Sequence, residues 1–219
     1  LRRQRQMCIR DSAGTATRFN RDTKEETLKC LYYTDEPQYA LLAQLLKNCG
    51  EYDKYILVGG YLYEKLGRFV KNELSGYGKK IELVYNKHFK DYGSGYSLYK
   101  GIEAIKEAGN VTFVEGDLFF MATDFRQVYN SPKSVITINR EPIYSNKAVA
   151  LYINVDGKPR YLYDTNHQTL TVSEPFKAIF NSGQMWKFSS SERLLKTVDS
   201  LTKEQLQGTN LEIIQAYFS

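Results

Sequence analysis

Short apolar runs and amphipathic segments alternate through the first half of the chain, and this alternation constrains the fold more than any other feature. Leucines recur at helical spacing in residues 38–48, and an apolar run at residues 54–58 indicates a buried strand. Further helices are expected at residues 61–74 and 95–108, and further strands at residues 80–85 and 110–114. This rhythm predicts an α/β fold with a mostly parallel central sheet, flanked by helices and joined by right-handed crossovers. Ligands of such sheets bind at the carboxyl ends of the strands.

The second half of the chain has a different character. Strands are expected at residues 134–140 and 147–155, and Asp156-Gly157 forms a plausible hairpin turn that returns the chain through residues 159–162. Two later sequences, Ser189-Ser190-Ser191-Glu192 and Thr202-Lys203-Glu204-Gln205, resemble capping boxes that begin helices. We expect a smaller mixed β region here, within a single domain that covers residues 13–219.

Composition excludes several classes of protein. The 219 residues suffice for one sizeable core, and no apolar run approaches the length of a transmembrane helix. Three Cys argue against a disulfide framework and fit a reducing cytoplasm, and the two His form no zinc-binding pattern with them. We therefore expect a cytoplasmic protein that does not bind membranes. The sequence carries no signal for an oligomeric state.

A stretch of small residues near the amino terminus is the first candidate for chemistry. It reads Ala13-Gly14-Thr15-Ala16-Thr17 and is followed directly by Arg18-Phe19. A polar segment then separates it from Lys29. Small side chains let backbone N–H groups approach a triphosphate, and an Arg and a Lys can neutralise phosphate charge. Small-residue turns are common, so this pattern alone is not specific.

Together these residues resemble the signature of nucleotidyltransferases that join an NTP to a phosphorylated sugar or to phosphocholine. That signature is a strand, A-A-G-x-G-[ST]-R-[FLM], a polar stretch and P-K-x-L. The matching residues are Ala13, Gly14, Thr17, Arg18, Phe19, Lys29 and Leu31. Ala16 replaces the second glycine, and Leu28 replaces the proline before the lysine. The resemblance implies a Rossmann-like fold of the GT-A type, with a nucleotide-binding half at residues 13–130 and an acceptor half at residues 131–219. It also implies that Arg18 and Lys29 are catalytic and that residues 13–17 hold the nucleotide.

Residues 1–12 do not supply the hydrophobic strand that this family places before the loop. They are polar, show no strand alternation, and lack the apolar core of a signal peptide. Gln6–Ser12 can be back-translated as CAG ATG TGT ATA AGA GAC AG, which resembles the end of a transposon used to prepare sequencing libraries. We interpret residues 1–12 as a non-native scar that replaced the first strand. The alternative is a basic arm for nucleic acid or an acidic membrane.

This interpretation changes the meaning of the net charge. The whole chain has 30 basic and 25 acidic residues, for a charge of +5. Residues 1–12 hold four Arg and one Asp, so the rest of the chain has 26 basic and 24 acidic residues, for +2. The basicity therefore gives little support for a nucleic-acid-binding protein.

The loops after the predicted strands supply further candidates for nucleotide binding. Gly59 and Tyr61 follow the strand at residues 54–58, and the resemblance supports a ligand contact there, although Gly59 also suits a tight turn. Asn86, Ser94 and Ser97 follow the strand at residues 80–85, where a helix amino terminus favours an anion. Ser94 is equally suited to be a helix N-cap. Asn86 and Tyr96-Ser97-Leu98 match best the phosphocholine cytidylyltransferase branch, which makes Tyr96 a candidate for acceptor binding.

Acidic residues are the candidates for a metal site. Asp117 follows the strand at residues 110–114, and the resemblance implies that it holds Mg²⁺, which prefers hard oxygen ligands. Its neighbour Glu115 is the competing carboxylate. For the second ligand we expect Glu212, with Asn210 as the alternative residue facing the site. Lys147 is expected to meet the acceptor phosphate, unless it is a solvated lysine at a strand end.

The resemblance implies a Mg²⁺-dependent nucleotidyltransferase that transfers CMP from CTP to phosphocholine and releases pyrophosphate, in cell-surface polysaccharide biosynthesis. One alternative is a sugar-1-phosphate nucleotidyltransferase that uses UTP or dTTP. Another is a catalytically impaired nucleotide-binding homologue, because Ala16, Leu28 and the missing first strand depart from the pattern. The partners are then an NTP and a small phosphorylated acceptor, and not a nucleic acid or a membrane. Aromatic rings bind quaternary ammonium groups, and the candidates for such a cage are Tyr92, Tyr96, Tyr144 and Tyr163.

Overall fold

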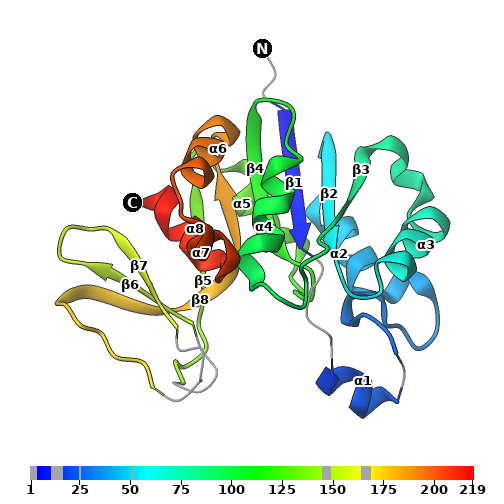
Figure 1. Ribbon diagram of the computed structural model, residues 1–219, viewed down its shortest axis with the longest axis horizontal. Helices are drawn as coiled ribbons and strands as arrows, with labels where there is room; N and C mark the ends of the chain where they lie inside the picture. Colours follow the sequence, from blue (N-terminus) through cyan, green and yellow to red (C-terminus); the bar gives the residue numbers. More distant parts are fainter. Residues whose placement is uncertain (1–3, 11–16, 25, 51, 145–148, 164–168) are drawn as a thin grey trace.

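A computed structural model describes residues 4–10, 17–24, 26–50, 52–144, 149–163 and 169–219, of which the side chains of residues 4–10, 17, 18 and 79 are not described. Its eight strands form one sheet in the order β3-β2-β1-β4-β8-β6-β7, with β5 paired to β8 (Figure 1). The strands are β1 Gln4–Arg10, β2 Lys54–Gly59, β3 Ile81–Tyr85, β4 Gly109–Glu115, β5 Val135–Asn139, β6 Ala150–Asn154, β7 Pro159–Leu162 and β8 Phe176–Phe188.

The sheet is mixed rather than mostly parallel. Strands β3, β2, β1 and β4 pair in parallel, as helical crossovers between them require. Every pair that involves β5, β6, β7 or β8 is antiparallel. The predicted α/β class is confirmed, but the parallel arrangement ends at β4, because the second half returns through the long antiparallel strand β8.

Strand β1 corrects the expectation that the polar segment at the amino terminus lacks a strand. It lies between β2 and β4, and the register aligns Cys8 with Ile56 on one side and with Phe113 on the other. Pairing in a sheet uses backbone N–H and C=O groups, so a polar sequence can occupy a central strand when its neighbours bring the apolar surface. The non-native origin of residues 1–12 stays a prediction.

Helices cover both faces of the sheet. Their bounds are α1 Thr17–Thr23, α2 Leu41–Cys49, α3 Tyr63–Glu73, α4 Ser94–Glu103, α5 Ala122–Asn130, α6 Ser191–Asp199, α7 Lys203–Gln207 and α8 Asn210–Phe218, with short 3-10 helices η1 Lys29–Leu31, η2 Pro37–Tyr39 and η3 Ser75–Lys80. The three helices expected in the first half are α2, α3 and α4. The capping box at Thr202 is confirmed, whereas α6 is capped by Ser190, one residue later than the predicted box.

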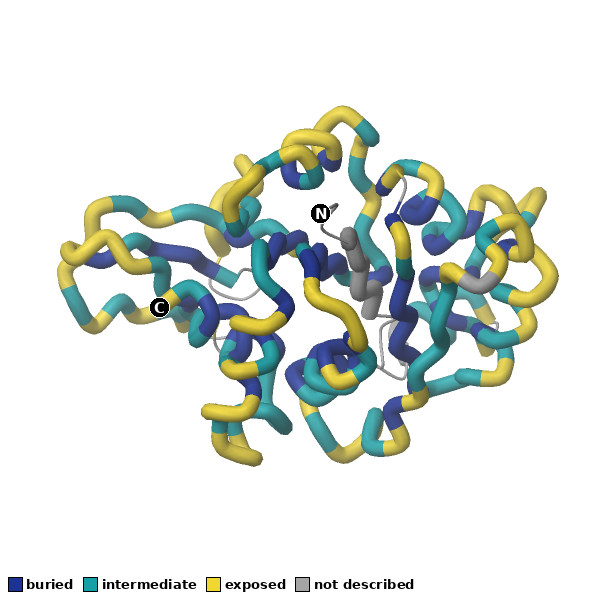
Figure 2. The backbone as a smooth tube through the Cα atoms, turned by 90° about the horizontal axis from the view of Figure 1, so that it is seen from above, coloured by how far each residue is buried: buried dark blue, intermediate teal, exposed yellow. Residues whose placement is uncertain are grey.

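Two hydrophobic clusters pack on opposite faces of the sheet. Tyr55 and Leu57 of β2 belong to the cluster under α2, α3 and α5, whereas Ile56 and Val58 belong to the cluster under α4, α6 and α8. This alternation is the one that a strand buried on both faces requires. Buried stretches run through the middle of the molecule and exposed loops surround them (Figure 2).

The strands β6 and β7 and the first part of β8 form an arm that extends from the body of the protein (Figure 1). β8 is exposed at Phe176 and fully buried at Phe188, where its second half enters the core. The arm is fastened to α8 because Tyr161 N–H donates to Gln215 Oε1 at 2.8 Å. Within the residues that the structure describes, every helix is too short or too polar to cross a bilayer.

Candidate functional site

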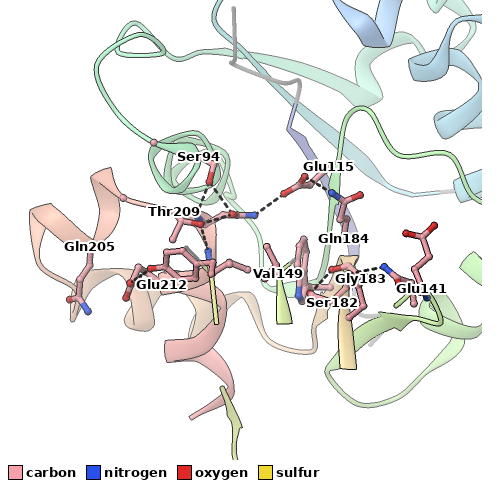
Figure 3. A pocket seen from close by; sticks show the side chains of 18 of the residues that line it. Ser94, Glu115, Glu141, Val149, Ser182, Gly183, Gln184, Gln205, Thr209 and Glu212 are labelled. Atoms are coloured by element: carbon pink, nitrogen blue, oxygen red, sulfur yellow. Dashed lines mark hydrogen bonds between the residues drawn. The ribbon is translucent and has the colours of Figure 1, made fainter. Parts of the chain in front are cut away.

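A cavity of about 950 Å³ opens between the body and the arm. Glu115 at the carboxyl end of β4 forms one wall, the amino termini of α4 and α8 form another, and β8 closes the third side (Figure 3). Its other lining residues include Asn139, Glu141, Val149, Tyr163, Asn181, Ser182, Gly183, Trp186, Glu204, Gln205 and Thr209. The carboxyl end of a parallel strand is where α/β sheets bind their ligands.

A hydrogen-bond network at one wall of the cavity joins four elements around Glu115. Asn210 Nδ2 donates to Glu115 Oε1 at 3.1 Å, and Gln184 Nε2 donates to Oε2 at 3.3 Å (Figure 3). Ser94 Oγ donates to Asn210 Oδ1 at 2.9 Å and accepts from the Asn210 backbone N–H at 2.9 Å. Asn210 is only 4% exposed, so the network fixes the start of α8 against β4. Asn210, the alternative to Glu212 as the residue facing the expected metal site, lines the cavity.

Lys29 and Asp117 meet although they are far apart in the sequence. Lys29 Nζ lies 3.4 Å from Asp117 Oδ2, and both side chains keep access to solvent. Asp117 follows β4 by two residues and is not part of the cavity lining, whereas Glu115 is. The expected metal ligand is therefore beside the lysine expected to bind phosphate, and the roles of both residues stay predictions.

The small-residue stretch cannot be compared with its prediction. Ala13, Gly14, Thr15 and Ala16 lie outside the described residues, and so does Lys147. Thr17 and Arg18 begin helix α1, and their side chains lie outside the description.

Glu212 lines the cavity on the side of the arm. Tyr163, which follows β7, donates its hydroxyl to Glu212 Oε1 at 2.7 Å. Burial, and then the hydrogen bond to Glu212, raises the pKa of Tyr163 to about 12, so its phenol is neutral at pH 7. Among the residues that the structure describes, no group of three or more His, Cys, Asp or Glu side chains is placed to hold a metal ion.

The amino terminus of α4 is occupied by the main chain of the α7–α8 turn. Gly93 N–H donates to Gln207 O at 2.7 Å, and Gly95 N–H donates to Gly208 O at 2.9 Å. A Cβ atom on Gly93 would lie 2.2 Å from Gly208 O, so only glycine permits this approach. The expectation that this helix offers free N–H groups to an anion is wrong for these two groups, because backbone carbonyls already use them.

Three of the predicted nucleotide contacts have close neighbours within the protein, and their roles in nucleotide binding stay predictions. Asn86 and Ser97 are buried, and Asn86 Nδ2 donates to Ser97 Oγ at 2.9 Å. A Cβ atom on Gly59 would lie 2.7 Å from Leu66 Cδ2, so the end of β2 packs closely against α3. None of the three lines the cavity.

Of the tyrosines predicted to contact a ligand, some have partners within the protein and one lines the cavity. Tyr61 donates its hydroxyl to Glu26 Oε1 at 2.7 Å and holds the segment before η1. Tyr92 and Tyr96 pack with each other and with His88, at centroid distances of 4.7–5.5 Å. Of the four tyrosines proposed for a choline cage, only Tyr163 lines the cavity.

Sequence reasoning missed the contribution of the antiparallel strands. Gln184 and Ser182 of β8 and Asn139 of β5 line the cavity, because β8 pairs with β4 and β5 pairs with β8. The sequence signal for this wall was the polar pair Ser182 and Gln184, which comes just before the buried Trp186 and Phe188 on the same strand. Glu115, which the sequence offered as the carboxylate competing with Asp117, is the last residue of β4 and lines the cavity.

Solved nucleotidyltransferases share this fold. The inositol-1-phosphate CTP transferase of T. maritima is 15% identical with a TM-score of 0.68, over 97% of this chain and 80% of that one. A UDP-glucose pyrophosphorylase complexed with UDP-glucose is 13% identical with a TM-score of 0.65, over 99% of this chain and 88% of that one. A nucleoside-diphosphate-sugar pyrophosphorylase of Vibrio cholerae RC9 is 11% identical with a TM-score of 0.61, over 96% and 86%. At these identities the likeness establishes the fold alone.

The model of one sequence family matches residues 25–219, and the chain belongs to that family, which is described as a domain of unknown function (DUF6564). No curated protein matches the sequence. The match begins after the small-residue stretch and includes Lys29, Asp117 and every residue of the cavity lining.

Proposed function

We propose that this protein is a nucleotidyltransferase that transfers an NMP from an NTP to a phosphorylated acceptor and releases pyrophosphate. The observation that carries the proposal is the contact between Lys29 and Asp117 at the carboxyl end of β4. The signature motif assigns Lys29 to the phosphates, and the wider resemblance assigns Asp117 to the metal, although the two residues lie 88 positions apart. Asp117 follows Glu115, which lines the cavity, by two residues, in a fold that solved nucleotidyltransferases share.

In the proposed reaction, an oxygen of the acceptor phosphate attacks the α-phosphorus of the NTP. The bond between the α-phosphorus and its bridging oxygen to the β-phosphate breaks, and pyrophosphate leaves with the electron pair. No covalent intermediate with the protein is needed, because the acceptor is already an anionic nucleophile. Lys29, and Arg18 by the motif, offset the charge that grows on the phosphates, and positioning provides the rest of the catalysis.

The residues present fit Mg²⁺. This ion is usually held by one or two carboxylates together with substrate phosphates and water. Asp117 offers one partly exposed carboxylate beside Lys29, which suits an ion shared with a triphosphate. When bound, Mg²⁺ would polarise the phosphate oxygens and offset their charge.

The motif favours CTP as the nucleotide and phosphocholine as the acceptor. Four glutamates line the cavity, and the described part of its lining contains no Lys or Arg. This charge supports an acceptor with a positively charged end. The alternatives are a sugar 1-phosphate with UTP or dTTP, and a homologue that binds a nucleotide without turning it over.

Pyrophosphate release tests the proposal. The protein is incubated with Mg²⁺, each NTP in turn, and either phosphocholine, phosphoethanolamine or one of several sugar 1-phosphates. Turnover that requires both an NTP and an acceptor supports the proposal, and the productive pair identifies the substrates. NTP binding without turnover on any pair supports the impaired homologue, and the absence of both contradicts the proposal.

A further inference from the structure

We infer that Glu212, held by Tyr163, contacts the acceptor through its carboxylate and is not a metal ligand. It receives an N–H or O–H donor from the end of the acceptor remote from its phosphate. This inference rests on the proposed nucleotidyl transfer and assigns the acceptor-recognition part of the same site, but it favours an acceptor with an N–H or O–H donor over the phosphocholine that the resemblance implies. It also replaces the expectation that Glu212 shares a metal ion with Asp117.

The location of Glu212 separates it from the expected metal position. Glu212 lines the cavity from the first turn of α8, and Tyr163 lines it from the arm. Asp117 does not line the cavity and contacts Lys29 instead. In Figure 3, Glu115 and Gln184 lie together on one side of the cavity, and Glu212 lies apart from them, near Thr209 at the start of α8.

The arm fixes the position of the Glu212 carboxylate. Three residues at or just after β7 bond to α8 and its C-cap: Arg160 to Ser219, the C-cap, at 3.0 Å, Tyr161 to Gln215 at 2.8 Å, and Tyr163 to Glu212 at 2.7 Å. Positions 212, 215 and 219 are three and four apart, so they share a helix face. The contacts therefore form a row, of which Tyr163–Glu212 is the end that reaches the cavity.

The chemistry of this pair selects a hydrogen-bond donor. An ionised carboxylate accepts about four hydrogen bonds, and Tyr163 uses one of them at Oε1. The polar lining of the cavity also contains amides and hydroxyls, such as Asn139, Asn181 and Ser182, which suit hydroxyl or ammonium groups. A protonated primary amine and a sugar hydroxyl both supply such donors. The trimethylammonium group of phosphocholine supplies none.

Kinetics with Glu212→Gln and Tyr163→Phe distinguish acceptor contact from metal binding. The matched control is Glu192→Gln, the same change in the first turn of α6, outside the cavity. The acceptor KM and the Mg²⁺ concentration for half-maximal activation are measured for each variant. We expect Glu212→Gln to raise the acceptor KM at least tenfold and Tyr163→Phe to raise it about threefold, with the Mg²⁺ midpoint within twofold of wild type. A shifted Mg²⁺ midpoint with unchanged acceptor KM, or no change in either, overturns the inference.

Comparing phosphoethanolamine, a sugar 1-phosphate and phosphocholine shows whether the donor is an ammonium group or a hydroxyl group. A larger KM effect of Glu212→Gln on phosphoethanolamine identifies an ammonium donor, and a larger effect on a sugar 1-phosphate identifies a hydroxyl. The effect on phosphocholine should be the smallest of the three. An effect on phosphocholine as large as on the other two overturns the assignment of a donor.

Calorimetry without NTP or metal keeps this inference separate from the proposed function. Wild-type protein should bind one of the three acceptors at least tenfold more tightly than Glu212→Gln does. Equal binding by the two proteins, or no binding of any acceptor by wild type, overturns the inference. If wild type binds an acceptor but releases no pyrophosphate on any pair, the proposed function fails while the binding data still decide the role of Glu212.

Discussion

Lys29 Nζ lies 3.4 Å from Asp117 Oδ2, a contact between residues 88 positions apart in the sequence. Lys29 is the first residue of η1, and its neighbours Leu28 and Cys30 are fully buried under the helices of the first half. Its backbone position is therefore set by core packing, while its ammonium group stays accessible at the carboxyl end of β4. Such a group can exchange its carboxylate partner for a phosphate without any change in the core.

The first prediction concerns Asp117→Asn, which keeps the shape of the side chain and removes its charge. We expect pyrophosphate release to fall at least about 100-fold, because in the proposed mechanism Asp117 holds the Mg²⁺ that offsets charge in the transition state. The free energy of unfolding should change by less than about 1 kcal/mol, because a partly exposed ion pair contributes little. Both quantities are measured on the same preparation, by pyrophosphate assay and urea denaturation.

The control for this variant is Asp124→Asn, an exposed aspartate in the first turn of α5. It should keep wild-type turnover and lose only a few tenths of a kcal/mol from its favourable position at a helix amino terminus. Equal turnover in Asp117→Asn and Asp124→Asn would remove Asp117 from the mechanism.

The elements with strong hydrophobic periodicity were predictable, and two features of the sheet were not. β2, β3, β4 and the helices between them carry the pattern of a parallel sheet, because each must bury an apolar face or stripe. β1 carries no such pattern, since its place between β2 and β4 depends on backbone pairing. The antiparallel order of β5, β6, β7 and β8 depends on long-range register, which local sequence does not specify.

The candidate site was predictable only as far as its sequence motif. The resemblance selects Lys29 and Asp117 separately, and the structure places their side chains 3.4 Å apart, while the roles of both residues stay predictions. The resemblance does not indicate that the main chain of Gln207 and Gly208 occupies the amino terminus of α4. It also gives no reason for Gln184 to bond Glu115, since that contact exists only after β8 pairs with β4.

The second prediction tests the structural role of Ser97. Ser97→Ala removes the acceptor of the Asn86 Nδ2–H in a buried site, which should lower the free energy of unfolding by about 1–3 kcal/mol. Ser75→Ala, at the exposed start of η3, is the control and should change it by less than about 0.5 kcal/mol. NTP affinity, measured by calorimetry on the folded protein, should be unchanged in both. A weaker NTP affinity with unchanged stability would support the predicted nucleotide contact of Ser97 and contradict its structural role.

The third prediction concerns the close approach between α4 and the α7–α8 turn. A Cβ atom at position 93 would lie 2.2 Å from Gly208 O, so Gly93→Ala must displace that turn. We expect a loss of about 1–3 kcal/mol in the free energy of unfolding, as for overpacked sites. The acceptor KM should also rise, because the turn leads directly into Asn210 and the Glu115 network.

Gly67→Ala is the matched control for Gly93→Ala. Gly67 lies inside α3, and an added Cβ would meet only Leu83 Cδ1 at 3.9 Å. Alanine there should raise the free energy of unfolding by about 0.5–1 kcal/mol through helix propensity. If Gly93→Ala proves as stable as Gly67→Ala, the tight packing of the turn on α4 is wrong.

The fourth prediction uses the buried phenol of Tyr161, which accepts a hydrogen bond from Trp186 Nε1 at 2.7 Å. Burial raises the pKa of Tyr161 to about 12, and the bonds from Trp186 and Ser182 act in the opposite direction. Below pH 10 the phenol is neutral in both the folded and the unfolded chain, so its contribution to stability is fully present. Between pH 10 and about 12 only the unfolded chain releases the proton, so stability falls as pH rises, by up to about 3 kcal/mol.

Tyr161→Phe should therefore flatten the pH dependence of unfolding above pH 10. At pH 7 the same variant should be less stable by about 1–3 kcal/mol, because the Trp186 indole N–H loses its acceptor in a buried site. Urea denaturation at intervals from pH 7 to 12 measures both effects, and Tyr39→Phe, at a ring that is 59% exposed, should reproduce the wild-type curve. If the free energy of unfolding of Tyr161→Phe depends on pH above 10 as that of wild type does, the Tyr161 phenol titrates alike in the folded and unfolded chain. The contact between β7 and Trp186 is then weaker than the hydrogen bond implies.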